Sequence, residues 1–139
     1  MINNYLKDQY KILKNEINKN LHKVFSSAQF INGSEVKKFE MKLKKISNSN
    51  YVLGVANGTD ALLMTLMSIG VSRGDEVITS AFTFISSAES ITLLGAKPIF
   101  VDIDINNYNI DTKKIEQKIN SRTKAIVATS LYGNPAELI

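Results

Sequence analysis

The chain contains no cysteine and a single histidine, His22, and these two shortages exclude several kinds of site. Without cysteine there is no disulfide, no thiolate nucleophile and no cysteine-ligated metal. One histidine leaves little from which to build a zinc centre. His22 lies in a segment of helical periodicity with no evident partner, so we expect a surface or structural role for it. No metal site is predicted.

Long apolar runs are also missing. None approaches the roughly 20 residues that a membrane-spanning helix needs. The N-terminus, MINNYLKDQYKILKNE, has lysines but no continuous apolar core behind them, unlike a secretory signal. With 139 residues, 44% of them hydrophobic and 22% charged, the chain has the size and composition of one soluble globular domain. We therefore expect a cytoplasmic protein that does not enter a membrane.

Arginine is absent from the region where positive charge is concentrated. Residues 1–45 hold ten of the seventeen basic residues, all lysine, against four acidic ones, whereas the rest of the chain has seven basic and nine acidic residues. The lysines lie between apolar residues at helical spacing, which is typical of a solvated helix face. A nucleic-acid surface would need arginines and stacking aromatics on the same face. We expect no nucleic-acid partner.

Two amphipathic helices are predicted in residues 1–48. Apolar residues recur at steps of three or four along each of them, with Ser34 as the cap of the second: Leu6, Tyr10, Leu13, Ile17 and Leu21, then Val36, Phe39, Leu43 and Ile46. Neither helix would be stable alone in water, so each needs a surface on which to bury its apolar face. We interpret 1–48 as an N-terminal helical segment and 49–139 as an α/β domain.

From Asn48 onward, short apolar strands alternate with helices. The expected strands are 52–55, 76–79, 99–102 and 125–129, and the expected helices are 59–69, 85–94 and 112–119. This alternation predicts an α/β fold, a mostly parallel sheet with helices on both faces. The helix 59–69 is apolar nearly all round, so we expect it to be deeply buried.

An anion site is the first functional candidate. Asn57-Gly58 supplies a turn after the strand at 52–55, and Thr59-Asp60 is a natural helix start. Free N–H groups and the positive end of the helix dipole would then face the ligand, with the Thr59 hydroxyl beside them. The spacing is neither G-x-G-x-x-G nor a Walker loop, which disfavours a dinucleotide fold and an NTPase. On physics alone, a well-capped turn without a ligand is an equal alternative.

Two further features have a structural and a functional interpretation. Ser80 to Phe84 leaves a strand at the edge where α/β sheets bind ligands, and an aromatic ring there could stack on a flat cofactor. The alternative is that Phe82 and Phe84 fill the core. Asp102 and Asp104 could bind a metal, but their Asn- and Asp-rich context favours a turn and a helix cap.

Several segments, taken in order, carry a family resemblance. They read NGTDALLMTLMSIGVSRGDEVITSAFTFISSAESITLLGAKPIFVDID, YNID and RTKAIVATSLYGNPAEL, with FINGSEVKKFE ahead of them. Together they resemble the DegT/StrS family of pyridoxal-phosphate-dependent sugar aminotransferases over about two thirds of the chain. The resemblance implies the N-terminal part of a fold type I large domain, a homodimer, and transfer of an amino group, usually from glutamate, to a nucleotide-linked keto sugar. Products of such enzymes feed surface polysaccharide and related sugars.

The resemblance also implies site residues. Gly58 and Thr59 would bind the phosphate of pyridoxal 5'-phosphate with help from Asn57 and Asp60, and Phe84 would stack on the pyridine ring. Phe82 becomes the poorer stacking candidate.

The departures from the family pattern concern catalysis. The family's Schiff-base lysine and the acidic partner of the pyridine nitrogen come from segments beyond the point matching Ile139, so no catalytic residue is assigned in this chain. Lys97 and Lys124 do not occupy that lysine position, and Asn134 stands where many relatives have glutamine. Pro135 suits the start of a helix just as the sequence ends, which favours a truncated polypeptide or gene model.

Three functional hypotheses remain open. The chain is the N-terminal part of such an aminotransferase and inactive alone, or it is a non-enzymatic remnant that binds a phosphate ligand or an intact homologue. A dehydratase on the same scaffold is the third.

Overall fold

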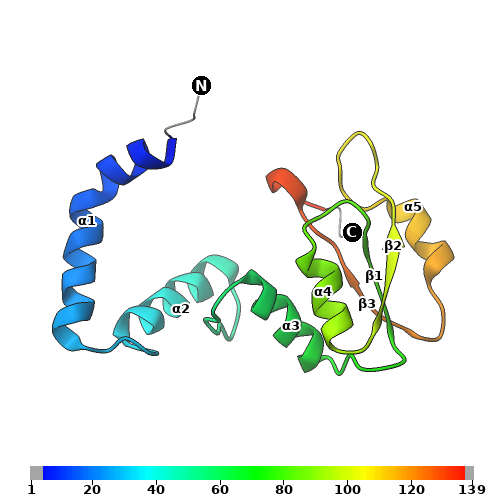
Figure 1. The fold of residues 1–139 in the computed structure, drawn as a ribbon, viewed down its shortest axis with the longest axis horizontal. Helices are drawn as coiled ribbons and strands as arrows, with labels where there is room; N and C mark the ends of the chain where they lie inside the picture. Colours follow the sequence, from blue (N-terminus) through cyan, green and yellow to red (C-terminus); the bar gives the residue numbers. More distant parts are fainter. Residues whose placement is uncertain (1–4, 137–139) are drawn as a thin grey trace. The chain divides into compact units, whose positions relative to one another are not determined.

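The structure is a computed structural model that describes residues 5–136. The chain divides into two compact units, Met1–Gly54 and Val55–Ile139, and each is described by itself (Figure 1). None of the helices in residues 5–136 is long and apolar enough to cross a membrane.

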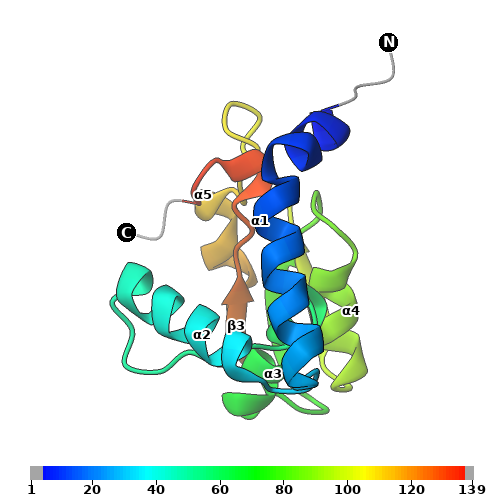
Figure 2. The same cartoon turned by 90° about the vertical axis from the view of Figure 1, so that its left-hand side faces the viewer.

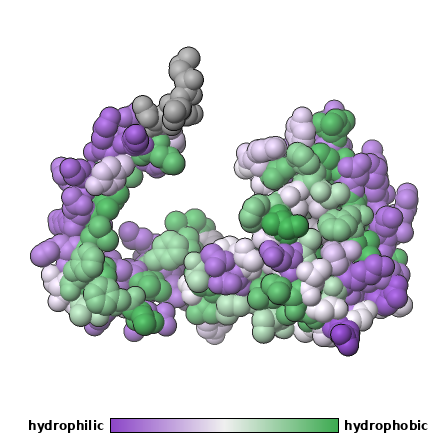
Figure 3. Space-filling model, viewed as in Figure 1, coloured by the Kyte–Doolittle hydropathy of each residue, from purple (hydrophilic) through white to green (hydrophobic). Residues whose placement is uncertain are grey.

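The first unit contains two helices, α1 (Tyr5–Ser27) and α2 (Ser34–Ser47), as the apolar spacing predicts. Neither has a buried residue. Figure 3 shows hydrophobic side chains along one side of α1 and hydrophilic ones along the other. The expectation that Ser34 caps α2 is wrong, because Gly33 is the N-cap residue, no side chain bonds there, and Ser34 is already helical.

The strand expected at 52–55 does not form within the described residues. A strand needs a hydrogen-bonded neighbour, and the Gly54 N–H instead donates to the Glu40 side chain of α2, at 2.8 Å. Residues 52–55 have the β-branched and apolar composition of a strand, but they pair with no other strand among residues 5–136.

The second unit is built on a three-stranded parallel sheet in the order β2-β1-β3. The central strand β1 (Glu76–Ser80) pairs with β2 (Lys97–Val101) on one side and with β3 (Thr123–Val127) on the other. All of β1 is buried, as expected for a central strand whose two faces and two edges are covered. The strands expected at 76–79, 99–102 and 125–129 are therefore confirmed to within two residues at their ends.

Helices cover both faces of this sheet, as the alternation predicts. Neighbouring side chains of β1 point to opposite faces: Val77 joins a cluster with Leu66 and Ile91, and Ile78 joins another with Val101 and Ile110. The first cluster belongs to α3 (Gly58–Ser68) and α4 (Ser86–Leu93), whereas α5 (Thr112–Ile115) packs on the second through Ile115. Figures 1 and 2 show α4 and α5 on opposite sides of the strands.

The burial predicted for the third helix is wrong. α3 forms where expected, but Leu66 is its only buried residue, and Met64 and Met67 are 45% and 56% exposed. Within its unit α3 packs mainly against α4, so one face is covered and the apolar residues on the others remain at the surface. An all-apolar sequence indicates what a helix can bury, and only its neighbours determine what it does bury.

The last helical segments are shorter than expected. The helix predicted at 112–119 is a single α-turn, α5, followed by the 3-10 turn η1 (Glu116–Lys118). Ile119 is extended, and Asn120 bonds to Glu76 rather than continuing the helix. After β3 comes a second 3-10 turn, η2 (Leu131–Gly133). The helix expected after Pro135 falls largely outside the described residues.

Candidate functional site

The parallel sheet brings the carboxyl ends of its three strands to one edge. The segments that leave this edge are the loop from Ala81 to Ile85 after β1, the turn beginning at Asp102 after β2, and the stretch from Ala128 after β3. In open α/β sheets this edge is the usual place for a ligand.

The first turn of α3 is closed by its own side chains. Asn57 is the N-cap residue, in an extended conformation, and its Oδ1 accepts a hydrogen bond from the Asp60 N–H at 2.9 Å. The Asn57 Nδ2 in turn donates to the Asp60 carboxylate at 3.0 Å. The structure thus brings two of the predicted site residues together and engages the Asp60 carboxylate within the turn itself.

This closure leaves two backbone donors free for a ligand. Gly58 and Thr59 are the first two helical residues, whose N–H groups have no acceptor inside a helix, and the cap serves only the third. Apart from the residues next to Gly58 and the backbone of α3 itself, no heavy atom of residues 5–136 lies within 4 Å of the position that a Gly58 Cβ would take, so the space beside this residue is open. Adjacent free donors, the positive end of an 11-residue helix and open space suit an anion such as a phosphate monoester.

Thr59 is also held from the other side. Its carbonyl oxygen accepts a hydrogen bond of 3.5 Å from the hydroxyl of Ser90 on α4, and Ser90 is fully buried. Sequence reasoning missed this residue, because nothing distinguishes one serine of the stretch SSAES from the others until the helices are placed.

The two phenylalanines after β1 have different surroundings. The Phe82 ring lies 6.3 Å from the Tyr108 ring, which in turn lies 6.2 Å from Tyr132 in an edge-to-face arrangement. Phe84 forms no aromatic pair within residues 5–136 and is 71% exposed, against 46% for Phe82. Phe84 lies two residues before the first residue of α4, and α4 packs on α3, so this helix supports both parts of the candidate site.

The loop that carries Phe84 is shaped by small polar side chains. The Ser80 hydroxyl accepts a hydrogen bond from the Phe82 N–H at 3.1 Å. The Thr83 hydroxyl is buried and has no hydrogen-bond partner among the described residues.

The remaining sequence candidates lie in structural roles. Asp102 accepts a hydrogen bond from the Ile103 N–H at 2.8 Å, and Asp104 accepts one from the Asn106 N–H at 2.8 Å, so both carboxylates act in the turn. His22 is exposed, and its Nε2 lies 3.5 Å from the Ser26 hydroxyl.

The two lysines considered as catalytic substitutes lie at the wrong edge of the sheet. Lys97 is the first residue of β2 and Lys124 the second of β3, so both sit at the amino ends of their strands. Neither is placed at the carboxyl edge, where the candidate site is.

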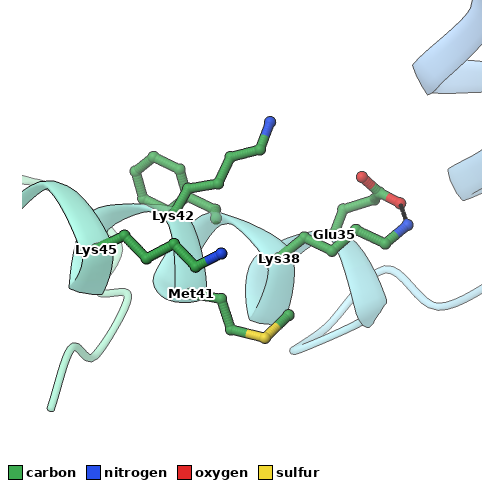
Figure 4. A pocket seen from close by; sticks show the side chains of 6 residues that line it. Glu35, Lys38, Met41, Lys42 and Lys45 are labelled. Carbon is green, nitrogen blue, oxygen red and sulfur yellow. Dashed lines mark hydrogen bonds and ion pairs between the residues drawn. The ribbon is translucent and has the colours of Figure 1, made fainter. Parts of the chain in front are cut away.

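A groove along α2 has no part in this site. Its walls are six side chains of that single helix, including Phe39, Met41 and Lys42 (Figure 4). Lys38 donates to Glu35 at 2.6 Å, and this bond holds the pKa of the Glu35 carboxyl below its ordinary value. Binding sites are usually concave and join polar groups from several elements, so we assign none here.

Comparison with known proteins adds independent findings. The chain matches the model of the DegT/DnrJ/EryC1/StrS aminotransferase family over residues 11–139. It is 45% identical over 132 residues to the UDP-2-acetamido-2-deoxy-3-oxo-D-glucuronate aminotransferase of Pseudomonas aeruginosa, a match that covers 95% of this chain and 37% of that protein. It is also 45% identical over 133 residues to a Geobacillus stearothermophilus protein called pleiotropic regulatory protein, covering 96% of this chain and 36% of that one.

Solved structures are similar as well. The crystal structure of ntda from Bacillus subtilis with bound cofactor PMP matches with a TM-score of 0.85 and 33% identity, over 88% of this chain and 28% of that one. The chain therefore spans about a third of the length of the curated relatives it matches.

Proposed function

The chain belongs to the DegT/DnrJ/EryC1/StrS aminotransferase family, and from that premise we propose that it forms the cofactor-phosphate site of a pyridoxal-phosphate-dependent sugar aminotransferase. The observation that carries the proposal is the first turn of α3, where the cap leaves the Gly58 and Thr59 N–H groups free beside open space. Fold alone would not support it, because one fold hosts many activities.

Each residue of the turn has its own part in holding the phosphate. The Gly58 and Thr59 N–H groups donate to phosphate oxygens, and the Thr59 hydroxyl adds a donor beside them. Asn57 and Asp60 act indirectly by fixing the turn. The Asp60 carboxylate accepts a hydrogen bond from the Asn57 side-chain amide. We propose no direct contact between this carboxylate and the phosphate, because the two negative charges would repel each other.

Phe84 provides the stacking face for the pyridine ring. Its exposed ring follows the strand that ends at the ligand edge, whereas Phe82 is engaged with Tyr108. The cofactor, when bound, supplies an electron sink that the protein lacks. The chain's own residues anchor its phosphate and hold one face of its ring.

The substrates and partners follow from the family and are part of the same proposal. The amino donor is glutamate, the acceptor is a keto sugar linked to a nucleotide, and the active assembly is a homodimer in the cytoplasm. The Pseudomonas aeruginosa relative is named for a UDP-linked keto sugar acid. We assign cofactor-binding residues and no catalytic lysine, since Lys97 and Lys124 lie at the amino ends of their strands, away from the candidate site.

A second candidate is a non-enzymatic protein that binds the phosphate ligand or an intact homologue. The observation that favours this second candidate is the Geobacillus relative, which is 45% identical to this chain and is named as a regulatory protein. The two candidates differ in turnover. Glutamate-dependent amination of a UDP-linked keto sugar, followed by mass spectrometry, supports the enzyme; reversible cofactor binding without product supports the second candidate.

Binding of pyridoxamine 5'-phosphate tests the phosphate site directly. This form carries an amine in place of the aldehyde, so it does not react with the many surface lysines. We expect a titration followed by 1H–15N NMR to shift the Gly58 and Thr59 amide resonances, inorganic phosphate to shift the same two, and pyridoxamine without phosphate to leave them in place. Unchanged Gly58 and Thr59 resonances with both phosphate ligands would overturn the proposed function.

A further inference from the structure

Three of the four buried residues of α4 are serines. Ser86, Ser87 and Ser90 are 8%, 4% and 0% exposed, and they stand at positions that share one face of a helix. Farther along the two helices the contact is apolar, because Leu66 of α3 and Ile91 of α4 belong to one cluster. The helices are thus held together by an apolar cluster, and the serines lie nearer the ligand edge.

One of these serines reaches the turn that binds the anion. The Ser90 hydroxyl donates to the Thr59 carbonyl at 3.5 Å. The Ser90 side chain is fully buried, so water does not compete for this long hydrogen bond. The other two serines make no side-chain hydrogen bond to α3 in the described part of the chain.

The bond matters because of the peptide group on which it acts. The Thr59 carbonyl and the Asp60 N–H belong to the same peptide unit, which is planar. Ser90 holds the oxygen of this unit, and the Asn57 Oδ1 accepts from its N–H at 2.9 Å. The plane is therefore held from both sides, by α4 and by the cap. The preceding peptide unit, which carries the Thr59 N–H, is joined to this plane through the Thr59 α-carbon. Holding the plane therefore limits the directions in which the Thr59 N–H can point.

We propose that Ser90 is a positioning residue for the phosphate-binding turn, acting through the Thr59–Asp60 peptide; the inference rests on the proposed function. It touches neither phosphate nor ring. Its hydroxyl limits the directions of the free Thr59 N–H before the ligand arrives, so that binding does not have to order it. Removal of the Ser90 hydroxyl should therefore weaken binding of the ligand's phosphate group and leave binding of its ring unchanged.

The test compares Ser90→Ala with a matched control, Ser87→Ala, which removes another buried serine hydroxyl, of a residue 4% exposed, from the same helix. Pyridoxamine 5'-phosphate and pyridoxamine are titrated into each variant of the whole 139-residue chain. We expect Ser90→Ala to weaken pyridoxamine 5'-phosphate binding by at most about fivefold, because binding must then order the turn that this hydrogen bond orders in the wild-type chain, and to leave pyridoxamine binding unchanged. Ser87→Ala should change neither. Ser90→Cys keeps the volume and a weak donor, and should fall between wild type and Ser90→Ala.

Two results would overturn the proposal: equal affinity of wild type and Ser90→Ala for pyridoxamine 5'-phosphate, or an equal loss in Ser87→Ala. Hydrogen exchange of the Asp60 amide in the ligand-free chain separates this inference from the proposed function. If the wild-type chain binds no phosphate ligand, the proposed function fails, yet faster Asp60 exchange in Ser90→Ala would still support the positioning of the turn. Unchanged exchange in that variant would overturn it.

Discussion

The side-chain amide Nδ2 of Asn134 donates a hydrogen bond to the main-chain carbonyl of Asn107 at 3.0 Å, and this bond joins the segments that follow β3 and β2. A second hydrogen bond joins the same segments, from the Asn109 Nδ2 to the Pro135 carbonyl at 2.9 Å. Tyr108, between Asn107 and Asn109, and Tyr132, two residues before Asn134, have left-handed φ angles of 60° and 56°. Such angles are uncommon outside glycine, so these contacts hold an unfavourable backbone in place.

Asn134→Ala should loosen the turn after β2 without unfolding the protein. Asn134 is exposed, so we expect the free energy of unfolding to fall by no more than about 0.5 kcal/mol. Amide exchange at Tyr108 and Asn109 should become several-fold faster, measured by hydrogen exchange and NMR. Asn134→Gln keeps the amide donor and should retain most of the protection; the same exchange in the alanine variant as in wild type would contradict this role of the hydrogen bond.

Asn57→Ala should destabilise the start of α3. It removes the acceptor for the Asp60 N–H, and loss of such a cap costs about 1 kcal/mol. Urea unfolding followed by circular dichroism measures this change. Asn57→Ser keeps a capping oxygen without adding charge, and should recover most of the stability. If both variants were as stable as wild type, the cap would have no energetic role.

Phe84→Ala and Phe82→Ala should have opposite effects. Phe84 is 71% exposed, so its loss should leave stability within about 0.5 kcal/mol while weakening pyridoxamine 5'-phosphate binding about fivefold through lost stacking. Phe82 packs on Tyr108, so its loss should lower stability by about 1 kcal/mol and leave binding unchanged. Titration of each variant with pyridoxamine 5'-phosphate measures the change in affinity, and unfolding curves measure the change in stability. Affinity untouched by Phe84→Ala would remove the stacking role.

Arg122→Ala should cost more stability than its exposure suggests. Its guanidinium lies 2.6 Å from the carboxylate of Glu76, whose side chain is 4% exposed, while Asn120 donates to the other carboxylate oxygen at 2.7 Å. Without arginine a buried charge loses its counter-ion, which should destabilise the protein by about 2 kcal/mol. Arg73→Ala is the control, because Arg73 forms no ion pair within the described chain. Equal urea midpoints for the two variants would refute the prediction.

Asp111 should make stability depend on acid pH. Partial desolvation raises the pKa of its carboxyl, but hydrogen bonds from Lys114 and from the Lys113 N–H outweigh this and hold the pKa below its ordinary 3.8. Because the folded pKa is the lower one, the contribution is present above about pH 4 and is lost as pH falls through the folded pKa. In Asp111→Asn, the unfolding midpoint should change less between about pH 6 and about pH 2.5.

The control for this pH dependence is Glu116→Gln, which removes a nearby exposed carboxylate that forms no ion pair within residues 5–136. Its profile should follow wild type. A profile for Asp111→Asn that also follows wild type would show that the Lys114 contact does not influence stability.

Most secondary-structure elements could be predicted from local patterns, and the exceptions share a cause. Helix periodicity and β-branched runs placed α1, α2, α3, α4 and the three strands near their observed ends. The expected strand at 52–55 lacks a ladder because pairing depends on a second segment. The expected burial of α3 is wrong because burial depends on what packs around a helix.

The candidate site divides in the same way. The turn at Asn57-Gly58 and a helix start within one residue of the observed one follow from residue types alone, whereas the structure shows that Asn57 is the cap. The preference for Phe84 over Phe82 came from the family resemblance, and the contact of Phe82 with Tyr108 is consistent with it. Ser90 could not be found from the sequence, because its partner is 31 residues away.

By itself the sequence determined the order of helices and strands, the α/β class and the turn at Asn57-Gly58 before a helix, because these depend on chemistry within a few residues. Only the tertiary structure decided the strand order β2-β1-β3, the half-exposed state of α3 and the hold of Ser90 on Thr59. Those features join segments distant in the chain, and such pairings depend on which apolar surfaces meet and which buried polar groups find partners.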